Sequence, residues 1–169
     1  MTDACRFARA ITRRPAPSAV DGLRAVDTGA PDLTLMLAHH AAYVAALRET
    51  GAAVIELPPL DAFPDALFVE DTALCLPEGA VLMRPGAPSR QGEVGHMAPV
   101  LAGIYDDLPC ITPPGHIEGG DILWTGREVL VGLSARTDAE GVRQLGAILD
   151  RWGRSLRGVE APRGVLHFK

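Results

Sequence analysis

The stretch that decides the fold begins with Ile117-Glu118-Gly119-Gly120-Asp121, continues through a short hairpin to Ser134-Ala135-Arg136-Thr137, and then enters a helix. An earlier stretch follows the same plan: Val69-Glu70-Asp71, a hairpin, Ser89-Arg90 and a helix. The two stretches lie about 50 residues apart, so we expect an internal repeat. Each copy places acidic side chains at the entry to a hairpin and an arginine at its exit.

Around this repeat, short β-like runs alternate with longer amphipathic stretches, which predicts an α/β fold. Helices are expected at about 33–50, 88–106 and 137–152, the last beginning with a capping-box sequence at Thr137-Asp-Ala-Glu140. Strands are expected at 6–12, 53–57, 66–76, 80–83, 109–112, 121–124, 128–133 and 164–168. If the repeated units surround a common axis, their acids and arginines face a shared central pocket.

The chain has 169 residues, so residues 1–169 are expected to form a single domain. Its composition, 47% hydrophobic and 22% charged, is that of a globular protein and excludes a disordered one. The formal net charge of −5 offers no general attraction for phosphate backbones or anionic lipids. The longest uncharged apolar stretch, 33–47, is too short and too polar to span a bilayer. We therefore expect neither a nucleic-acid nor a membrane partner.

The cysteines and the amino terminus indicate a reducing compartment. The chain has an odd number of cysteines, Cys5, Cys75 and Cys110, and none of them form a C-x-x-C motif. This argues against a disulfide scaffold or a structural zinc site. The first residues show no basic region followed by an apolar run, as a secretory signal would. A cytoplasmic location is the resulting expectation.

The motif Phe63-Pro-Asp65-Ala-Leu-Phe-Val-Glu70-Asp71 carries three carboxylates in an apolar run. A buried carboxylate without a partner is unfavourable, so such groups find a cation or shift their pKa. A guanidinium has enough N–H donors to satisfy Glu70, Asp71 and Glu118 together. A ligand of this kind would be arginine or a derivative, with its carboxylate held by Arg90 and Arg136 and its ammonium by Asp65.

Two alternatives need no such ligand. Glu70 and Asp71 could pair inside the protein with Arg84, Arg90 or Arg136. His116 and Glu118 could be two metal ligands, but a third and a fourth are absent at suitable spacing, so we expect no metal and no cofactor. The repetition of acids and arginines at matching positions favours the small-molecule guanidino ligand.

A series of motifs in this order resembles the dimethylarginine dimethylaminohydrolase family: Val20-Asp-Gly-Leu23, Phe63-Pro-Asp65 with Phe68-Val-Glu70-Asp71, Arg84-Pro-Gly-Ala-Pro-Ser-Arg90, Ile117-Glu118-Gly-Gly-Asp121, Ser134-Ala-Arg136-Thr137 and Val165-Leu-His167. The resemblance covers essentially the whole chain. It implies a pentein-type α/β propeller of about five ββαβ units, of which this chain would hold somewhat more than three. It also implies hydrolysis of N-methylated arginines to citrulline and a methylamine.

The resemblance also implies roles for individual residues. It makes His167 and Glu118 catalytic, and it gives substrate binding to Leu23, through its backbone, and to Asp65, Glu70, Asp71, Arg90 and Arg136. In the family, a cysteine thiolate attacks the guanidinium carbon. The histidine protonates the departing amine and then activates water.

One departure from the family concerns the nucleophile. The family's cysteine lies near the carboxyl terminus of a longer chain, whereas this sequence ends two residues after His167. Neither Cys5, Cys75 nor Cys110 matches it, so we expect an amino-terminal portion or a shortened member that recognises substrate without turnover. Exposed strand edges in an incomplete propeller would favour self-association. The alternatives are a non-catalytic arginine-binding remnant module and a hydrolase like arginine deiminase, which acts on unmethylated arginine.

Overall fold

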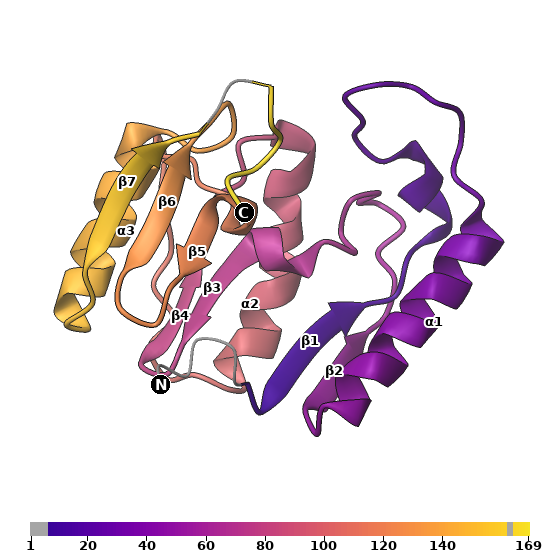
Figure 1. The fold of residues 1–169 in the computed structure, drawn as a ribbon, viewed down its shortest axis with the longest axis horizontal. Helices are drawn as coiled ribbons and strands as arrows, with labels where there is room; N and C mark the ends of the chain where they lie inside the picture. Colours follow the sequence, from indigo (N-terminus) through magenta and orange to yellow (C-terminus); the bar gives the residue numbers. More distant parts are fainter. Residues whose placement is uncertain (1–6, 162–163) are drawn as a thin grey trace. The chain divides into compact units, whose positions relative to one another are not determined.

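The structure, a computed structural model, describes residues 7–161 and 164–169 (Figure 1). The chain divides after Val69 into two compact units. The expectation of one domain over residues 1–169 stays a prediction. Of the helices in the described residues, none combines the length and the apolar character that crossing a membrane requires.

The unit that ends at Val69 is a β-α-β element. Strand β1 (Arg9–Arg13) and strand β2 (Ala53–Leu57) pair in parallel, with Arg9 opposite Ala53 and Arg13 opposite Leu57. The 3-10 turn η1 (Pro17–Asp21) and helix α1 (Leu33–Glu49) connect them. A parallel pair needs such a crossover, because a tight turn can join only antiparallel strands. The Asp32 side chain starts α1 by accepting a hydrogen bond from the Leu35 amide, at the predicted position.

The other unit contains the internal repeat. In the first copy, η2 (Val69–Thr72) leads into the antiparallel hairpin of β3 (Ala73–Leu76) and β4 (Gly79–Leu82). The 3-10 turn η3 (Pro88–Glu93) and helix α2 (Val94–Ala102) follow. The chain then returns to form a parallel bridge between Cys110 and Leu82.

The second copy has the same order. The 3-10 turn η4 (Gly119–Asp121) leads into the antiparallel hairpin of β5 (Ile122–Trp124) and β6 (Val129–Leu133). Helix α3 (Ala139–Arg151) follows, and β7 (Leu156–Glu160) returns parallel to β6 (Figure 1). The predicted repeat is confirmed, since both copies contain a hairpin followed by a helix; the return is the strand β7 in the second copy and an isolated bridge at Cys110 in the first.

Three predicted strands are wrong. Over 109–112 the chain makes only an isolated bridge, between Cys110 and Leu82. Over 66–76 only β3 is a strand, because the preceding residues form tight turns in which the Ala66 amide bonds the Phe63 carbonyl and the Phe68 amide bonds the Asp65 carbonyl. Over 164–168 no strand forms, because the Phe168 amide bonds the Asp121 carboxylate instead of a neighbouring strand. Strand β7 was not predicted, since its charged and glycine residues hide the apolar alternation.

The cap of α3 also differs from the prediction. The sequence Thr137-Asp-Ala-Glu140 predicts Thr137 as the capping residue, but Asp138 caps the helix by accepting from the Gly141 amide at 2.7 Å. The Thr137 hydroxyl is engaged elsewhere, since it donates to the buried Asp121 carboxylate. A tertiary hydrogen bond has therefore displaced a local one.

The core of this unit lies between the two hairpins and α3. Its buried apolar side chains are Leu76, Val81, Met83, Ile111, Ile117, Ile122, Val129, Val131, Leu145, Ile148 and Leu149. Both copies of the repeat contribute, so neither hairpin buries its apolar face alone. The polar turns η2 and η4, which carry the predicted acids, stand at the starts of the two hairpins.

Replacing Ile122 by valine tests this packing. Ile122 is buried on β5, and the loss of one methylene should lower the free energy of unfolding by about 0.5–1.5 kcal/mol. Urea denaturation monitored by tryptophan fluorescence measures the change. The matched control is Leu35→Ala on α1, where the side chain is exposed and a much smaller change is expected. A larger loss from Leu35→Ala than from Ile122→Val would contradict the packing described.

Candidate active site

Glu118 is the most deeply buried of the predicted acids. It precedes η4, and its side chain is fully buried. Its Oε1 accepts hydrogen bonds from the amides of Gly86 and Ala87, at 3.0 and 3.4 Å, and from Arg136 Nη1 at 3.2 Å. Among the described residues, its other oxygen, Oε2, has no hydrogen-bond partner. The site therefore contains a buried carboxylate oxygen that still requires a donor.

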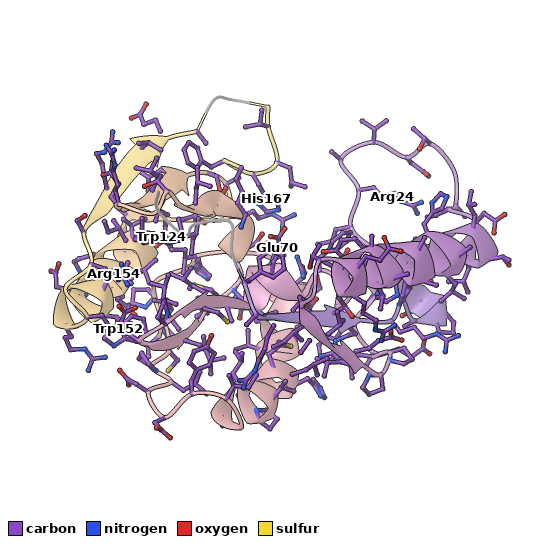
Figure 2. All side chains as sticks on the ribbon, turned by 60° about the horizontal axis from the view of Figure 1, so that its bottom comes forward. Arg24, Glu70, Trp124, Trp152, Arg154 and His167 are labelled. Carbon is purple, nitrogen blue, oxygen red and sulfur yellow. The ribbon has the colours of Figure 1, made fainter. Side chains whose placement is uncertain are left out.

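His167 faces that oxygen. Its Nε2 lies 4.0 Å from Glu118 Oε2, and its Nδ1 lies 3.7 Å from Asp121 Oδ1. Both distances exceed a hydrogen bond, and hydrogen bonds at catalytic sites are often long in the unliganded state. Figure 2 shows His167 and Glu70 as neighbours at one end of the unit, while Trp124, Trp152 and Arg154 lie at the other end. The structure thus brings together the two residues predicted to be catalytic.

Asp71 lies in the same cluster but is already paired. Its Oδ2 accepts a hydrogen bond from Arg90 Nη1 at 2.5 Å, and its Oδ1 accepts one from the Gly120 amide at 2.8 Å. The neighbouring Gly119 lets the two turns approach, because a Cβ there would overlap the Glu70 carbonyl. The Gly-Gly pair of the motif is therefore a steric requirement for bringing η2 against η4.

Arg90 is enclosed by carboxylates. Besides Asp71 it binds Glu93, through Nε to Oε1 at 3.0 Å and through Nη2 to Oε2 at 2.8 Å. Burial alone would lower the pKa of Arg90, but the hydrogen bonds and charges of Glu93 and Asp71 outweigh burial and raise it above the ordinary value. Glu93 was not identified from the sequence. Its position three residues after Arg90, a spacing at which ion pairs form on helices, could have indicated this pair. The internal ion pair considered as an alternative thus exists between Asp71 and Arg90.

Arg136 occupies the equivalent position in the second copy but is held differently. Its side chain is 24% exposed, against 5% for Arg90. It forms an ion pair with Glu118 Oε1, and its amide donates to the Ser134 hydroxyl. That both arginines hold a substrate carboxylate stays a prediction. The geometry favours Arg136 for this task, because the Arg90 guanidinium is committed to Asp71 and Glu93.

Glu70 is the exposed member of the three predicted guanidinium acids. Its side chain is 62% exposed, and its Oε2 lies 3.2 Å from Lys169 Nζ. Lys169 is the chain's only lysine. The three acids therefore differ in burial and pairing. Glu118 is buried, with one oxygen that has no partner among the described residues, and Asp71 is buried and paired. Glu70 is mostly exposed and lies beside the long side chain of Lys169.

Leu23 and Asp65 lie in the unit that ends at Val69, where they contact each other. The Leu23 amide donates to both Asp65 oxygens, at 3.0 and 3.3 Å. Gly22 allows this approach, because a Cβ there would stand 2.8 Å from Asp65 Oδ1. The two residues predicted for the amino-acid head group are thus brought together. Their role in binding stays a prediction.

Asp121 was quoted in the motif without a role, and the structure gives it several contacts. Its Oδ2 accepts from the hydroxyls of Ser134 and Thr137, at 2.7 and 2.6 Å. Its Oδ1 accepts from the Phe168 amide at 3.0 Å. It therefore links the Glu-Gly-Gly-Asp and Ser-Ala-Arg-Thr motifs to the segment of His167. The sequence could have indicated these contacts, because one motif contains the acid Asp121 and the other contains the hydroxyls of Ser134 and Thr137.

A metal fits this cluster poorly. Ligand atoms of Asp71, Glu118 and His167 lie within 4.8 Å of one another. Both Asp71 oxygens, however, already accept hydrogen bonds, and Arg90 compensates the charge of that carboxylate. This leaves one carboxylate and one imidazole, fewer than the protein ligands that a bound metal usually takes. The ring of His116, considered with Glu118 as a ligand pair, instead contacts Asp138 at 3.1 Å.

The cysteines within the described residues, Cys75 and Cys110, are both free thiols. Cys75 lies on β3, where desolvation raises the pKa of its thiol and a hydrogen bond with Tyr105 only partly opposes the change. A raised pKa disfavours the thiolate, which is the reactive form of a nucleophile. Cys5 lies outside the described residues.

Comparison with known proteins identifies the relatives of this chain. The family model described as arginine deiminase matches residues 34–157. The dimethylarginine dimethylaminohydrolase of Pseudomonas aeruginosa is 42% identical over 164 residues, covering 96% of this chain and 64% of the relative. The Streptomyces coelicolor enzyme of the same name is 36% identical over 162 residues, covering 95% and 62%.

A solved structure shows the same likeness. A mutant of the Pseudomonas aeruginosa enzyme complexed with citrulline superposes with a TM-score of 0.91 at 42% identity, over 94% of this chain and 62% of that one. The chain thus spans less than two thirds of the length of these relatives. The resemblance seen in the motifs is confirmed, as is an α/β fold of the pentein type. The chain belongs to the arginine deiminase family, and among its members it is similar to the dimethylarginine dimethylaminohydrolases.

Proposed function

We propose that this chain supplies the substrate-binding and proton-transfer groups of a hydrolase that converts dimethylarginine to citrulline and dimethylamine. The observation that carries the proposal is Glu118 Oε2, a buried carboxylate oxygen that has no partner in the described part of the chain and lies 4.0 Å from His167 Nε2. The likeness to dimethylarginine dimethylaminohydrolases, one of them complexed with citrulline, supports this substrate class.

A guanidinium is the ligand that this arrangement would stabilise best. It offers several N–H donors in one plane, and one of them would satisfy Glu118 Oε2. Binding would therefore gain both the Coulomb attraction and the hydrogen bond that the unliganded site lacks. Asp71 adds negative charge nearby, although Arg90 compensates much of it. Citrulline, which is neutral, would lose the attraction and leave.

His167 is the group suited to move protons in the reaction. Attack by a cysteine thiolate on the guanidinium carbon breaks its bond to the methylated nitrogen, and imidazolium would protonate the departing amine. The neutral imidazole would then take a proton from a water molecule whose oxygen attacks the same carbon, and breaking of the C–S bond releases citrulline and the thiolate. Glu118 would hold the cation in place during both steps. We assign the nucleophile to neither Cys75 nor Cys110.

Further parts of the proposal concern the remaining residues and the assembly. Arg136 would bind the substrate carboxylate, and Leu23 with Asp65 would bind the amino-acid head. The chain would hold somewhat more than three of about five units of a propeller, a proposal supported by the two repeated copies of hairpin and helix. Self-association through strand edges and a cytoplasmic location stay predictions.

The test is to measure binding and turnover separately on the 169-residue chain. Calorimetric titration should show binding of asymmetric dimethylarginine and weaker binding of citrulline, while a colorimetric citrulline assay should show no product. The absence of turnover follows because no described cysteine is suited to be the nucleophile. Failure to bind any guanidino amino acid would refute the proposal.

Two outcomes would favour the alternative functions. Tighter binding of arginine than of dimethylarginine would indicate a deiminase, which the matching family model makes the natural second candidate. Sequencing the DNA that follows the codon for Lys169 separates an enzyme from a non-catalytic remnant. An in-frame continuation with a late cysteine supports the enzyme, and a stop codon supports an arginine-binding module.

A further inference from the structure

One carboxylate oxygen of Asp121 lies close to two groups of the terminal segment, residues 164–169: the Phe168 amide and the His167 ring. Oδ1 accepts the Phe168 amide at 3.0 Å and stands 3.7 Å from His167 Nδ1. Among the described residues, Nδ1 of His167 has no hydrogen-bond partner, although it is buried. A buried polar atom that faces a carboxylate oxygen is unfavourable until the two bond, so a shift of about 0.8 Å would be stabilising.

The second oxygen of Asp121 fixes the carboxylate itself. Oδ2 receives two short hydroxyl hydrogen bonds, from Ser134 and Thr137, and the whole side chain is fully buried. Ser134 follows β6 directly, and Thr137 lies just before α3. The carboxylate is thus immobilised from one side by the second repeat and presents Oδ1 to the terminal segment on the other. A group held in this way can orient another side chain.

Two glycines leave room for the terminal segment to pack. A Cβ on Gly120 would stand 2.7 Å from His167 Cγ, and a Cβ on Gly132 would overlap Phe168 Cβ. The Lys169 amide also donates to the Gly120 carbonyl at 3.3 Å. Figure 1 shows the carboxyl-terminal end of the chain near the start of β5. The segment is therefore fitted to η4 and β6, although it forms no strand.

We propose that Asp121 is a positioning residue for His167: it holds the Nδ1–H tautomer of the imidazole, so that Nε2 is the nitrogen that exchanges protons. The proton carried by one ring nitrogen is set by the hydrogen bond that it makes. With Nδ1–H directed at Asp121 Oδ1, Nε2 is left facing Glu118 Oε2, where a guanidinium would bind. Asp121 gains no proton in either step. The inference rests on the proposed proton-transfer role of His167.

Other charged groups near the ring do not replace Asp121 in this role. Glu118 faces the opposite nitrogen, and Asp71 is committed to Arg90 and to the Gly120 amide. Lys169 and Glu70 pair with each other. Among the described residues, Asp121 is the one acid whose carboxylate makes an ion-pair contact with His167 Nδ1.

Nitrogen NMR of the 169-residue chain labelled with ¹⁵N-histidine tests the proposal. The His167 signals are assigned with a His167→Gln sample, and the tautomer is read from the two ring-nitrogen shifts where the imidazole is neutral. The unmodified chain should show mainly Nδ1–H. In Asp121→Asn this fraction should fall, because an amide oxygen holds an N–H more weakly than a carboxylate does. Hydrogen exchange of the Phe168 amide should become at least tenfold faster.

The matched control is Ser134→Ala combined with Thr137→Val, which removes the hydroxyl partners of Oδ2 and leaves Oδ1 in place. This variant should melt at a lower temperature but keep the Nδ1–H tautomer. A dominant Nε2–H tautomer in the unmodified chain would overturn the proposal, even if Asp121→Asn did not fold. An equal tautomer change in the control would also overturn it. No substrate is needed, so this result is independent of the titration that tests the function.

Discussion

Glu118→Gln is expected to weaken the binding of asymmetric dimethylarginine by about 10- to 100-fold, the loss that corresponds to one buried charge-assisted hydrogen bond of about 1.5–3 kcal/mol. Glutamine retains the shape of the side chain and can keep its carbonyl oxygen toward the Gly86 and Ala87 amides. It replaces Oε2 by an amide nitrogen, which repels the N–H donors of a guanidinium. Calorimetric titration measures the change.

The same substitution should leave the fold intact. A buried carboxylate oxygen without a partner contributes nothing favourable to the unliganded protein, so its removal should change the melting temperature by only a few degrees. A loss of affinity without a loss of stability is the signature of a residue retained for its ligand. A large fall in melting temperature would instead assign Glu118 a structural role.

The matched control is Glu70→Gln, which removes another of the predicted guanidinium acids. Glu70 is mostly exposed and pairs with Lys169, so solvent screens its charge and the affinity should change only a few-fold. If Glu70→Gln weakened binding as much as Glu118→Gln, burial would not be what distinguishes the acids. Unchanged affinity in Glu118→Gln would remove the main support for the proposed function.

Arg90→Met is expected to destabilise the chain by about 3–5 kcal/mol, because it leaves two buried carboxylates, Asp71 and Glu93, without their cation. Methionine preserves much of the side-chain volume, so the decrease in the free energy of unfolding reflects mainly the removal of the positive charge. Urea denaturation followed by circular dichroism measures the change in the free energy of unfolding. Adding Asp71→Asn and Glu93→Gln to the same chain should recover part of the loss, since no buried charge would remain unpaired.

Arg143→Met is the control with the same spacing. Arg143 pairs with Glu140 at three residues, as Arg90 does with Glu93, but this pair is exposed. Hydrogen bonds from Arg143 and Gln144 lower the pKa of Glu140 to about 2, so the pair is formed. Because solvent screens it, its loss should leave the denaturation midpoint almost unchanged. Equal effects from Arg90→Met and Arg143→Met would contradict the buried ion-pair network.

The sequence predicted the repeat because its signals are local. Hairpin turns, apolar alternation and helical periodicity each depend on residues close together in the chain, so both copies could be recognised from their order. It also predicted that Glu118 and His167 would meet, but this came from resemblance to a family and not from spacing. The strand predicted over 164–168 failed because its hydrogen-bond partner is the distant side chain of Asp121.

The sequence by itself predicted the α/β class, the repeat of hairpin and helix, and a set of charged residues that would surround a guanidinium. Only the tertiary structure decided which of these charged side chains pair with one another and which stay exposed. Arg90 and Arg136 occupy matching positions, yet one is enclosed by Asp71 and Glu93 while the other reaches Glu118 and solvent. Pairing depends on which turns approach in space, and Gly119 and Gly120 allow η2 and η4 to approach closely. Within residues 7–161 and 164–169, one oxygen of Glu118 is left without a donor, which no local pattern of residues could show.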